Sequence, residues 1–187
     1  MNDTDIIAAT HAWVETVVID LNLCPFAKRE LVKERIRFAV TRVSNEEGLI
    51  QALEQELRHL QEHPEIETSL LVHPDALTDF EDYNQFLDLV DILIRQLRLS
   101  GDIQVASFHP DYQFQGTEPD DVENTTNRSP YPMLHLIREA SIGAAIANYP
   151  DPEGIPERNI ETVERLGIDH MRALLRACFN REGNSQD

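Results

Sequence analysis

The sequence repeats one short motif with side chains that can carry protons: the triplet His73-Pro74-Asp75 recurs as His109-Pro110-Asp111. Each triplet directly follows an apolar run that is typical of a strand. If the two strands are parallel, both imidazoles lie at the carboxyl end of the sheet, where open α/β folds bind ligands. We therefore expect His109 to act as a general acid or base. The alternative is structural, since proline and aspartate also serve to end strands.

Cys24 is a candidate nucleophile. It precedes Pro25, and because proline is favoured at the first position of a helix, we expect the cysteine to occupy the cap of a short helix. The helix dipole, with Lys28 and Arg29 one turn away, would favour the thiolate and lower the pKa of the thiol. In the alternative, the Cys24 thiol is packed in the core, which is also where we expect Cys178, on an apolar helical stripe.

An anion site is predicted at the segment Asn127-Arg128-Ser129-Pro130. Serine followed by proline is typical of a helix start, so we expect a helix from Ser129 through Ala144. The free N–H groups of the first turn and the guanidinium of Arg128 would together bind a phosphate or carboxylate. Asn127, Arg128 and Ser129 are the expected ligands. The alternative is that Ser129 is an ordinary helix cap.

The same predicted helix would carry a polar face. At about 100° per residue, His135 and Arg138 fall on the side opposite the alanines, together with Tyr131 and Glu139. We expect Arg138 to contribute to the anion site and His135 to be a second proton carrier or to orient the substrate. The alternative is the solvated face of an amphipathic helix.

The motifs for common cofactors are absent from the sequence. A transition-metal site would draw on Cys24, His73, His109 and His135, with Asp75 or Asp111 beside them, but none of these has a diagnostic spacing. The acidic residues between positions 118 and 123 either hold Mg²⁺ near a bound phosphate or form solvated turns. ATPases, dinucleotide enzymes and α/β-hydrolases lose their usual sequence support. The cofactor and the metal content stay open.

Three predicted strands, at residues 35–42, 68–72 and 103–108, alternate with two predicted helices. Capping-box pairs mark the helix starts at Ser44/Glu47 and Thr78/Glu81. This order predicts an α/β fold whose small, mainly parallel sheet of about three strands is flanked by helices, with additional N- and C-terminal helices. We expect a single domain at residues 1–180 and a flexible tail at 181–187. The aperiodic stretch after Phe108 would be functional or disordered.

Composition restricts the class of protein. A chain of 187 residues suffices for one domain, and 41% hydrophobic with 27% charged residues excludes a disordered chain. The formal charge of −18 argues against nucleic acid and anionic membranes as partners. Two cysteines cannot form a disulfide framework, and neither a signal peptide nor a membrane span is visible. We expect a cytoplasmic protein.

Three strings of the sequence, LNLCPF at 21–26, FHPDYQF at 108–114 and NRSPYP at 127–132, resemble those of an uncharacterised bacterial family with a domain of unknown function. The resemblance extends from the first predicted helix to the region of Ala144. It implies that the positions singled out above are those on which the pattern of the family centres. It implies no activity, substrate or cofactor.

These observations favour an enzyme that acts on a small anionic metabolite. Arg128 and the N–H groups after Ser129 would bind the anion, His109 would be the general acid or base, and Cys24 would be the nucleophile or a ligand. One alternative is a non-catalytic module that binds an anionic ligand or a basic partner. A metal-dependent hydrolase is the third hypothesis. The oligomeric state stays open.

Overall fold

The sheet consists of four strands in the order β1-β2-β4-β3. In this computed structural model, which describes residues 2–147 and 149–180, they are β1 (Ile36–Val40), β2 (Thr68–Val72), β3 (Ile103–Phe108) and β4 (Met133–Arg138). β1 and β2 are parallel, whereas β4 lies between β2 and β3 and is antiparallel to both. β1, β2 and β3 therefore run in one direction, and their carboxyl ends share one edge of the sheet.

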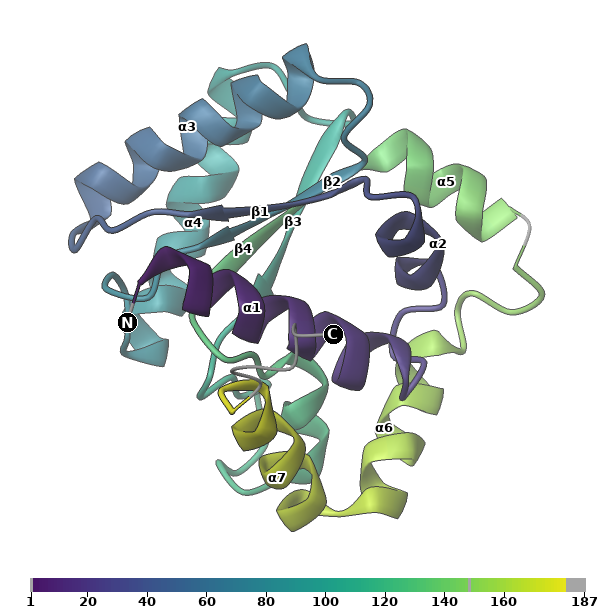
Figure 1. Ribbon diagram of the computed structural model, residues 1–187. Helices are drawn as coiled ribbons and strands as arrows, with labels where there is room; N and C mark the ends of the chain where they lie inside the picture. The colour runs from purple at the N-terminus through teal and green to yellow at the C-terminus, as the bar shows by residue number, and fades with distance from the viewer. Residues whose placement is uncertain (1, 148, 181–187) are drawn as a thin grey trace, which may run out of the picture.

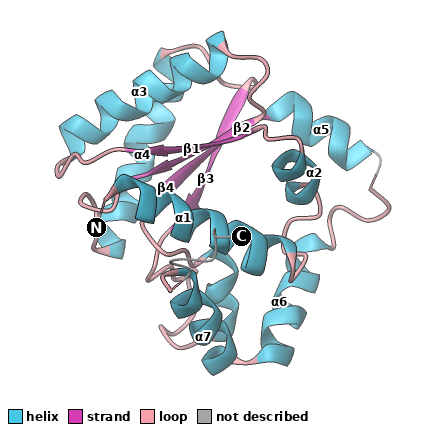
Figure 2. Cartoon of the chain, in the orientation of Figure 1, coloured by secondary structure: helices cyan, strands magenta, loops and turns pink. Residues whose placement is uncertain are grey.

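The expected α/β class and single domain are confirmed, with helices on both faces of the sheet (Figure 1; Figure 2). The sheet itself differs from the expected one, because it has a fourth strand and only one parallel pair. The strands predicted at 68–72 and 103–108 have the observed bounds. The tail expected at 181–187 lies outside the described residues.

The fourth strand comes from a segment for which the sequence predicts a helix. β4 is central, and its apolar residues are buried on both faces of the sheet, with Met133 on one face and Leu134 on the other. A run that is apolar on both faces lacks the alternation of a half-buried strand and cannot be told from a helix by its period. The helix in this region, α5 (Glu139–Ala147), begins only where β4 ends.

Each face of the sheet has its own apolar core and its own set of helices. One face carries α3 (Glu46–Glu62) and α4 (Phe80–Gln96), and the other carries α1 (Asp3–Trp13), the π-helix η1 (Val14–Ile19), α6 (Ile155–Leu166) and α7 (Ile168–Cys178). Residues alternate between the two cores along each strand, so Leu71 packs with α3 and α4 while Leu70 packs with α1. Cys178 is buried in the second core, as expected. Among the described residues, no helix combines the length and apolarity needed to cross a membrane.

The helix starts lie one residue from the predicted caps. Asn45 rather than Ser44 caps α3, because its side chain accepts a hydrogen bond from the N–H of Gly48. Asp79 rather than Thr78 caps α4 in the same way. Neighbouring residues of similar capping strength compete for such a position, and the sequence cannot decide between them.

The long stretch after β3 is held in place by side-chain amides. It ends in the 3₁₀ helix η2 (Val122–Asn127), whose Asn124 is fully buried. The Asn124 side chain accepts hydrogen bonds from the backbone N–H of Phe114 (2.8 Å) and the hydroxyl of Thr117 (2.9 Å), and donates to the carbonyl of Glu118 (2.8 Å). The stretch lacks a periodic pattern because it is an ordered loop held by side-chain hydrogen bonds.

Arg138 closes the end of α3 instead of binding an anion. It lies on the opposite face of β4 from His135, because the two residues are separated by an odd number of positions along the strand. Its guanidinium donates to the backbone carbonyls of Ile66 (3.1 Å), His63 (3.1 Å) and Leu60. These carbonyls include groups that the end of a helix leaves unpaired. The guanidinium that the sequence suggests as an anion ligand is thus bound to backbone carbonyls.

Replacing Arg138 with alanine is expected to lower the free energy of unfolding by about 2–3 kcal/mol, because hydrogen bonds from a charged donor to buried carbonyls are lost. Arg58→Ala is the matched control: Arg58 lies on α3 in an exposed pair with Glu54, and we expect a cost below about 1 kcal/mol. Urea unfolding of both variants measures the difference. Equal midpoints for the two variants would show that Arg138 has no capping role.

Candidate functional site

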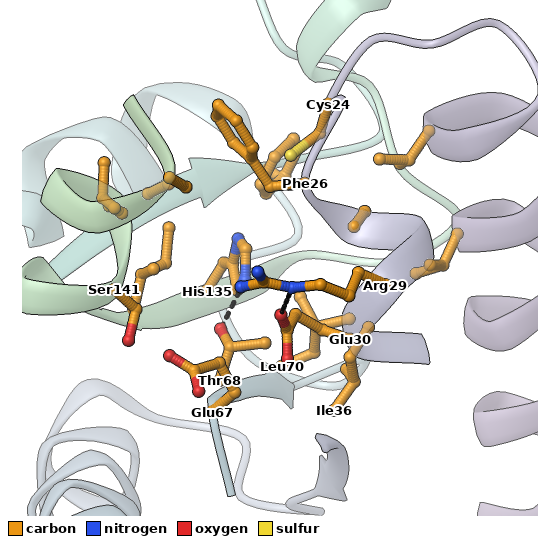
Figure 3. A pocket seen from close by; sticks show the side chains of 18 of the residues that line it. Cys24, Phe26, Arg29, Glu30, Ile36, Glu67, Thr68, Leu70, His135 and Ser141 are labelled. Carbon is orange, nitrogen blue, oxygen red and sulfur yellow. Dashed lines mark hydrogen bonds and ion pairs between the residues drawn. The ribbon is translucent and has the colours of Figure 1, made fainter. Parts of the chain in front are cut away.

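A cavity of about 300 Å³ lies over the face of the sheet that carries α1 (Figure 3). Its walls are mostly apolar and come from the end of α1, η1, α2 (Ala27–Val32), the strands of the sheet and α5. The polar residues that line it are Cys24, Arg29, Glu30, Glu67, Thr68, His135 and Ser141. Two of the predicted catalytic residues, Cys24 and His135, therefore line the same cavity.

The chain reaches the cavity through an unusual helix end. α1 continues into the π-helix η1, and Asn22 then adopts a left-handed backbone (φ 56°), which asparagine tolerates better than most residues. The turn folds the chain back, so that the N–H groups of Leu23 and Cys24 both donate to the carbonyl of Val18, at 2.9 Å and 3.3 Å. π-helical turns are frequent at functional sites, and here the turn delivers Cys24 to the cavity.

The Cys24 thiol is protonated at neutral pH, contrary to the sequence prediction. Burial raises its pKa, and this effect exceeds the opposite effect of the backbone N–H groups of Phe26 and Ala27, which donate to the sulfur. The predicted cap position is also wrong, because α2 begins at Ala27 and Phe26 precedes it as the cap residue. The sequence indicated the dipole and the nearby cations but not the depth of burial, which dominates the pKa.

His135 is a neutral imidazole with one ring nitrogen committed to the protein. Its Nε2 lies 2.7 Å from the hydroxyl oxygen of Thr68, which itself donates its proton to the carbonyl of Leu136 at 2.6 Å. Because Thr68 has only one proton to give, His135 Nε2 must be the donor, and Nδ1 carries the lone pair. Burial lowers the pKa of His135 to about 4. The imidazole is therefore neutral at pH 7.

The second ring nitrogen of His135 is available to a ligand. Within the described part of the chain, Nδ1 has no hydrogen-bond partner. In Figure 3 it points away from Thr68, on the side of the cavity where Cys24 and Phe26 lie. A neutral imidazole with an open lone pair can accept a proton or a hydrogen bond from a bound molecule.

A chain of ion pairs forms one wall of the cavity. Glu30 accepts hydrogen bonds from Arg29 (2.6 Å) and Arg35 (2.8 Å), and Arg35 also pairs with Oε2 of Glu67 at 3.2 Å. Burial acts to raise the pKa of Glu30, but the two arginines outweigh it, so the pKa lies below its ordinary value. The Arg29 guanidinium is thus already paired. Oε1 of Glu67, in contrast, is buried without a partner.

His109 lies outside this cavity and has no free ring nitrogen. Its Nδ1 accepts from the N–H of Asp111 (3.0 Å) and its Nε2 donates to the carbonyl of Leu77 (3.1 Å). His109 and His73 do lie at the same edge of the sheet, as expected, where both rings pack against Tyr83 at 5.1 Å and 5.9 Å between centroids. The geometry supports the structural alternative for both histidines over the proposed acid/base role of His109.

The predicted anion site at residues 127–129 does not form, because Ser129 leads into a strand and no helix begins there. The Asn127 amide donates to the carbonyl of Ser107 (3.2 Å), and the Ser129 hydroxyl donates to the carbonyl of Tyr131 (2.7 Å). The Asn127 side chain therefore holds the end of η2 against β3, and the Ser129 side chain stabilises a local turn before β4. Arg128 lines a different pocket, which is described below.

The described residues contain no group of three or more histidine, cysteine, aspartate or glutamate side chains that could hold a metal ion. Of the four ligands that the metal hypothesis requires, only Cys24 and His135 line the cavity. The acidic residues at 118–123 serve the loop instead: Asp121 accepts from the N–H of Glu118, and Asp120 pairs with Arg172.

Three polar residues of the cavity were not expected from the sequence: Thr68, Glu67 and Glu30. The only sequence signal for Thr68 is a polar residue at the start of an otherwise apolar strand, and threonine is common in strands. In the sequence, Glu30 and Glu67 cannot be told from ordinary surface carboxylates. Their shared partner, Arg35, is placed between them only by the fold. A tertiary contact of this kind leaves no periodic pattern in the sequence.

Stability is expected to fall between about pH 6.5 and pH 4. The pKa of both His73 and His135 is lowered to about 4 in the folded chain, whereas the unfolded chain binds protons below about 6.5. The unfolded state then holds more protons in this range, so each histidine contributes a loss of up to roughly 3 kcal/mol as the pH falls. Urea unfolding at several pH values measures this loss of unfolding free energy, which should be smaller in His135→Gln than in the parent. The control, His11→Gln, replaces a more exposed histidine and should show the same loss as the parent. A parent-like pH profile in His135→Gln would contradict the buried neutral state.

The chain was compared with protein families, curated proteins and solved structures. A family model described as "Protein of unknown function (DUF1415)" matches residues 5–173. The searches of curated proteins and of solved structures each found no match. The matched residues run from α1 into α7 and include every residue that lines the cavity. The chain therefore belongs to the DUF1415 family of proteins of unknown function.

Proposed function

We propose that the protein is an enzyme that binds a small, largely apolar organic molecule in the cavity and reacts with it through Cys24. The observation that carries this proposal is the position of Cys24 and His135 in one mostly apolar cavity of about 300 Å³. A volume of this size lies at the lower end of the range for small-molecule sites. Apolar walls with a few polar groups are also typical of such sites.

The polar groups of the cavity favour a ligand that donates hydrogen bonds. His135 Nδ1 and Glu67 Oε1 are both acceptors without a partner in the described residues. Arg29, the one arginine among the described lining residues, is paired with Glu30. A hydroxyl, amide or amine at the polar end of the ligand satisfies these acceptors, whereas an anion would meet a carboxylate. The anionic substrate that the sequence suggests therefore suits this cavity poorly.

The proposed reaction starts from a neutral thiol and a neutral imidazole. The sulfur of Cys24 supplies the electron pair of a new bond to the electrophilic carbon of a double bond in the ligand, and the π electrons of that double bond move to its other atom. The S–H bond breaks, and its proton passes to Nδ1 of His135, directly or through one water molecule. The N–H groups of Phe26 and Ala27 stabilise the negative charge as it develops on the sulfur. The thiol and the imidazole are both neutral before the reaction, which is favourable in an apolar cavity because an isolated charge has a high free energy there.

A non-catalytic binding protein is the second candidate function. The observation in its favour is the raised pKa of Cys24, since a protonated thiol is a poor nucleophile unless a base removes its proton. The two candidates differ in whether His135 activates Cys24. This difference is measurable without knowledge of the natural ligand.

The test is the rate of alkylation of Cys24 by N-ethylmaleimide, a small neutral electrophile, in a Cys178→Ser background that leaves one thiol. We expect His135→Gln to slow the reaction at pH 7 by about tenfold or more, because a positioned base contributes at least that much. Thr68→Val is expected to slow it less, since the imidazole stays but loses the partner that fixes its tautomer. His11→Gln serves as the control and should react at the parental rate.

The same alkylation assay can be repeated with reagents of different charge and at different pH values. Iodoacetate should react more slowly with Cys24 than neutral iodoacetamide, because the cavity offers no unpaired cation among its described lining residues. The rate for either reagent should still rise above pH 9, because the pKa of the thiol is raised. Equal N-ethylmaleimide rates in the parent and in His135→Gln would contradict the enzyme proposal and favour the binding protein.

A further inference from the structure

A second pocket, of about 360 Å³, lies between the loop after β3 and α7. Among the described residues that line it, three are arginines, Arg128, Arg172 and Arg176, and one is acidic, Asp111. The whole chain has 16 Lys and Arg residues against 34 Asp and Glu residues. Three guanidinium groups at one pocket of so acidic a protein require an explanation.

Arg128 is held rigidly and still has a donor to spare. Its Nε donates to the carbonyl of Tyr112 (3.2 Å) and one terminal nitrogen donates to the carbonyl of Pro119 (2.6 Å). The other terminal nitrogen has no partner in the described part of the chain. Burial lowers the pKa of Arg128, an effect that Arg172 adds to and that Asp111 and Asp120 oppose. The guanidinium is therefore fixed in place with its charge only partly compensated.

The other two arginines come from consecutive turns of α7. Arg172 and Arg176 are four residues apart and both line the pocket, although like charges at this spacing destabilise a helix. Arg172 pairs with Asp120 through one terminal nitrogen, and Arg176 has no partner among the described residues. Counted over the described residues, the arginines of this pocket carry more positive charge than Asp111 and Asp120 neutralise.

We propose that this pocket binds a small oxyanion, such as a phosphate or a carboxylate-bearing metabolite. Planar guanidinium groups bind such anions through two parallel hydrogen bonds, and three of them around one pocket would replace the hydration shell of the anion. The site is independent of Cys24 and His135, which line the other cavity. It also accounts for the anion-binding role that the sequence suggests for Arg128, with Arg172 and Arg176 as its partners in place of Asn127, Ser129 and Arg138.

The single tryptophan of the chain reports on this pocket. Trp13 donates its indole N–H to the backbone carbonyl of Arg128 at 3.0 Å, and its ring lines the cavity that contains Cys24. An anion that draws on Arg128 is expected to change the emission of Trp13. The fluorescence titration therefore serves as a second readout beside the heat of binding.

The experiment is calorimetric titration of the full chain with inorganic phosphate and, separately, with citrate, in a buffer of low ionic strength. We expect saturable binding of one equivalent, weakened about tenfold or more in Arg176→Ala because one charged pair of hydrogen bonds is lost. Arg176 is exposed, so its replacement should leave the fold intact. Arg128→Lys should also weaken binding, because lysine keeps the charge but not the forked geometry. The ratio of the two affinities distinguishes a phosphate site from a carboxylate site.

Arg95→Ala provides the charge-matched control, because Arg95 is exposed on α4, on the other face of the sheet. Its affinity for either anion should equal that of the parent. Equal weakening in Arg95→Ala and Arg176→Ala would show that only the overall charge matters and would overturn the proposal. The absence of saturable heat and of any change in Trp13 emission with both anions at millimolar concentration would overturn it as well.

Discussion

The fold and the cavity both depend on the pairing of β4 with two neighbours. β4 pairs with β2 on one edge, over residues 133–137, and with β3 on the other, over residues 133–138. Without it, β2 and β3 have no common partner and the sheet is divided. Because successive side chains of a strand point to opposite faces, the same six residues place His135 in the cavity and Arg138 at the end of α3. One strand thereby lines the cavity and closes the end of α3.

Burial has more influence than formal charge on the chemistry of the cavity. The helix dipole and the nearby cations predict a thiolate at Cys24, yet the protein around the sulfur favours the neutral thiol. The same desolvation keeps His135 neutral. Where charges are present in the wall, as in Glu30, they are paired with arginines. Apart from these paired charges, the two candidate reactive groups of the cavity, Cys24 and His135, are neutral.

Arginine serves two purposes in this protein because its guanidinium has more donors than a single contact uses. Arg138 donates hydrogen bonds to the carbonyls at the end of α3 and has a structural role. Arg128 uses part of its fork to hold the loop after β3 and directs the remainder to a pocket. The sequence cannot separate these two uses, since both appear as an arginine next to a polar segment. Only the positions of the surrounding carbonyls decide between them.

The sequence by itself determined the α/β class, the strands of residues 68–72 and 103–108, and the helices α3 and α4, because these features follow from local periodicity and from capping residues. It also singled out Cys24 and His135, although for other reasons than their shared cavity. The tertiary structure decided that residues 133–138 form a strand, that Cys24 is protonated, and that Arg128 belongs with Arg172 and Arg176. These properties depend on partners far away in the chain. Pairing across a sheet and desolvation by distant segments leave no local pattern that the order of residues could reveal.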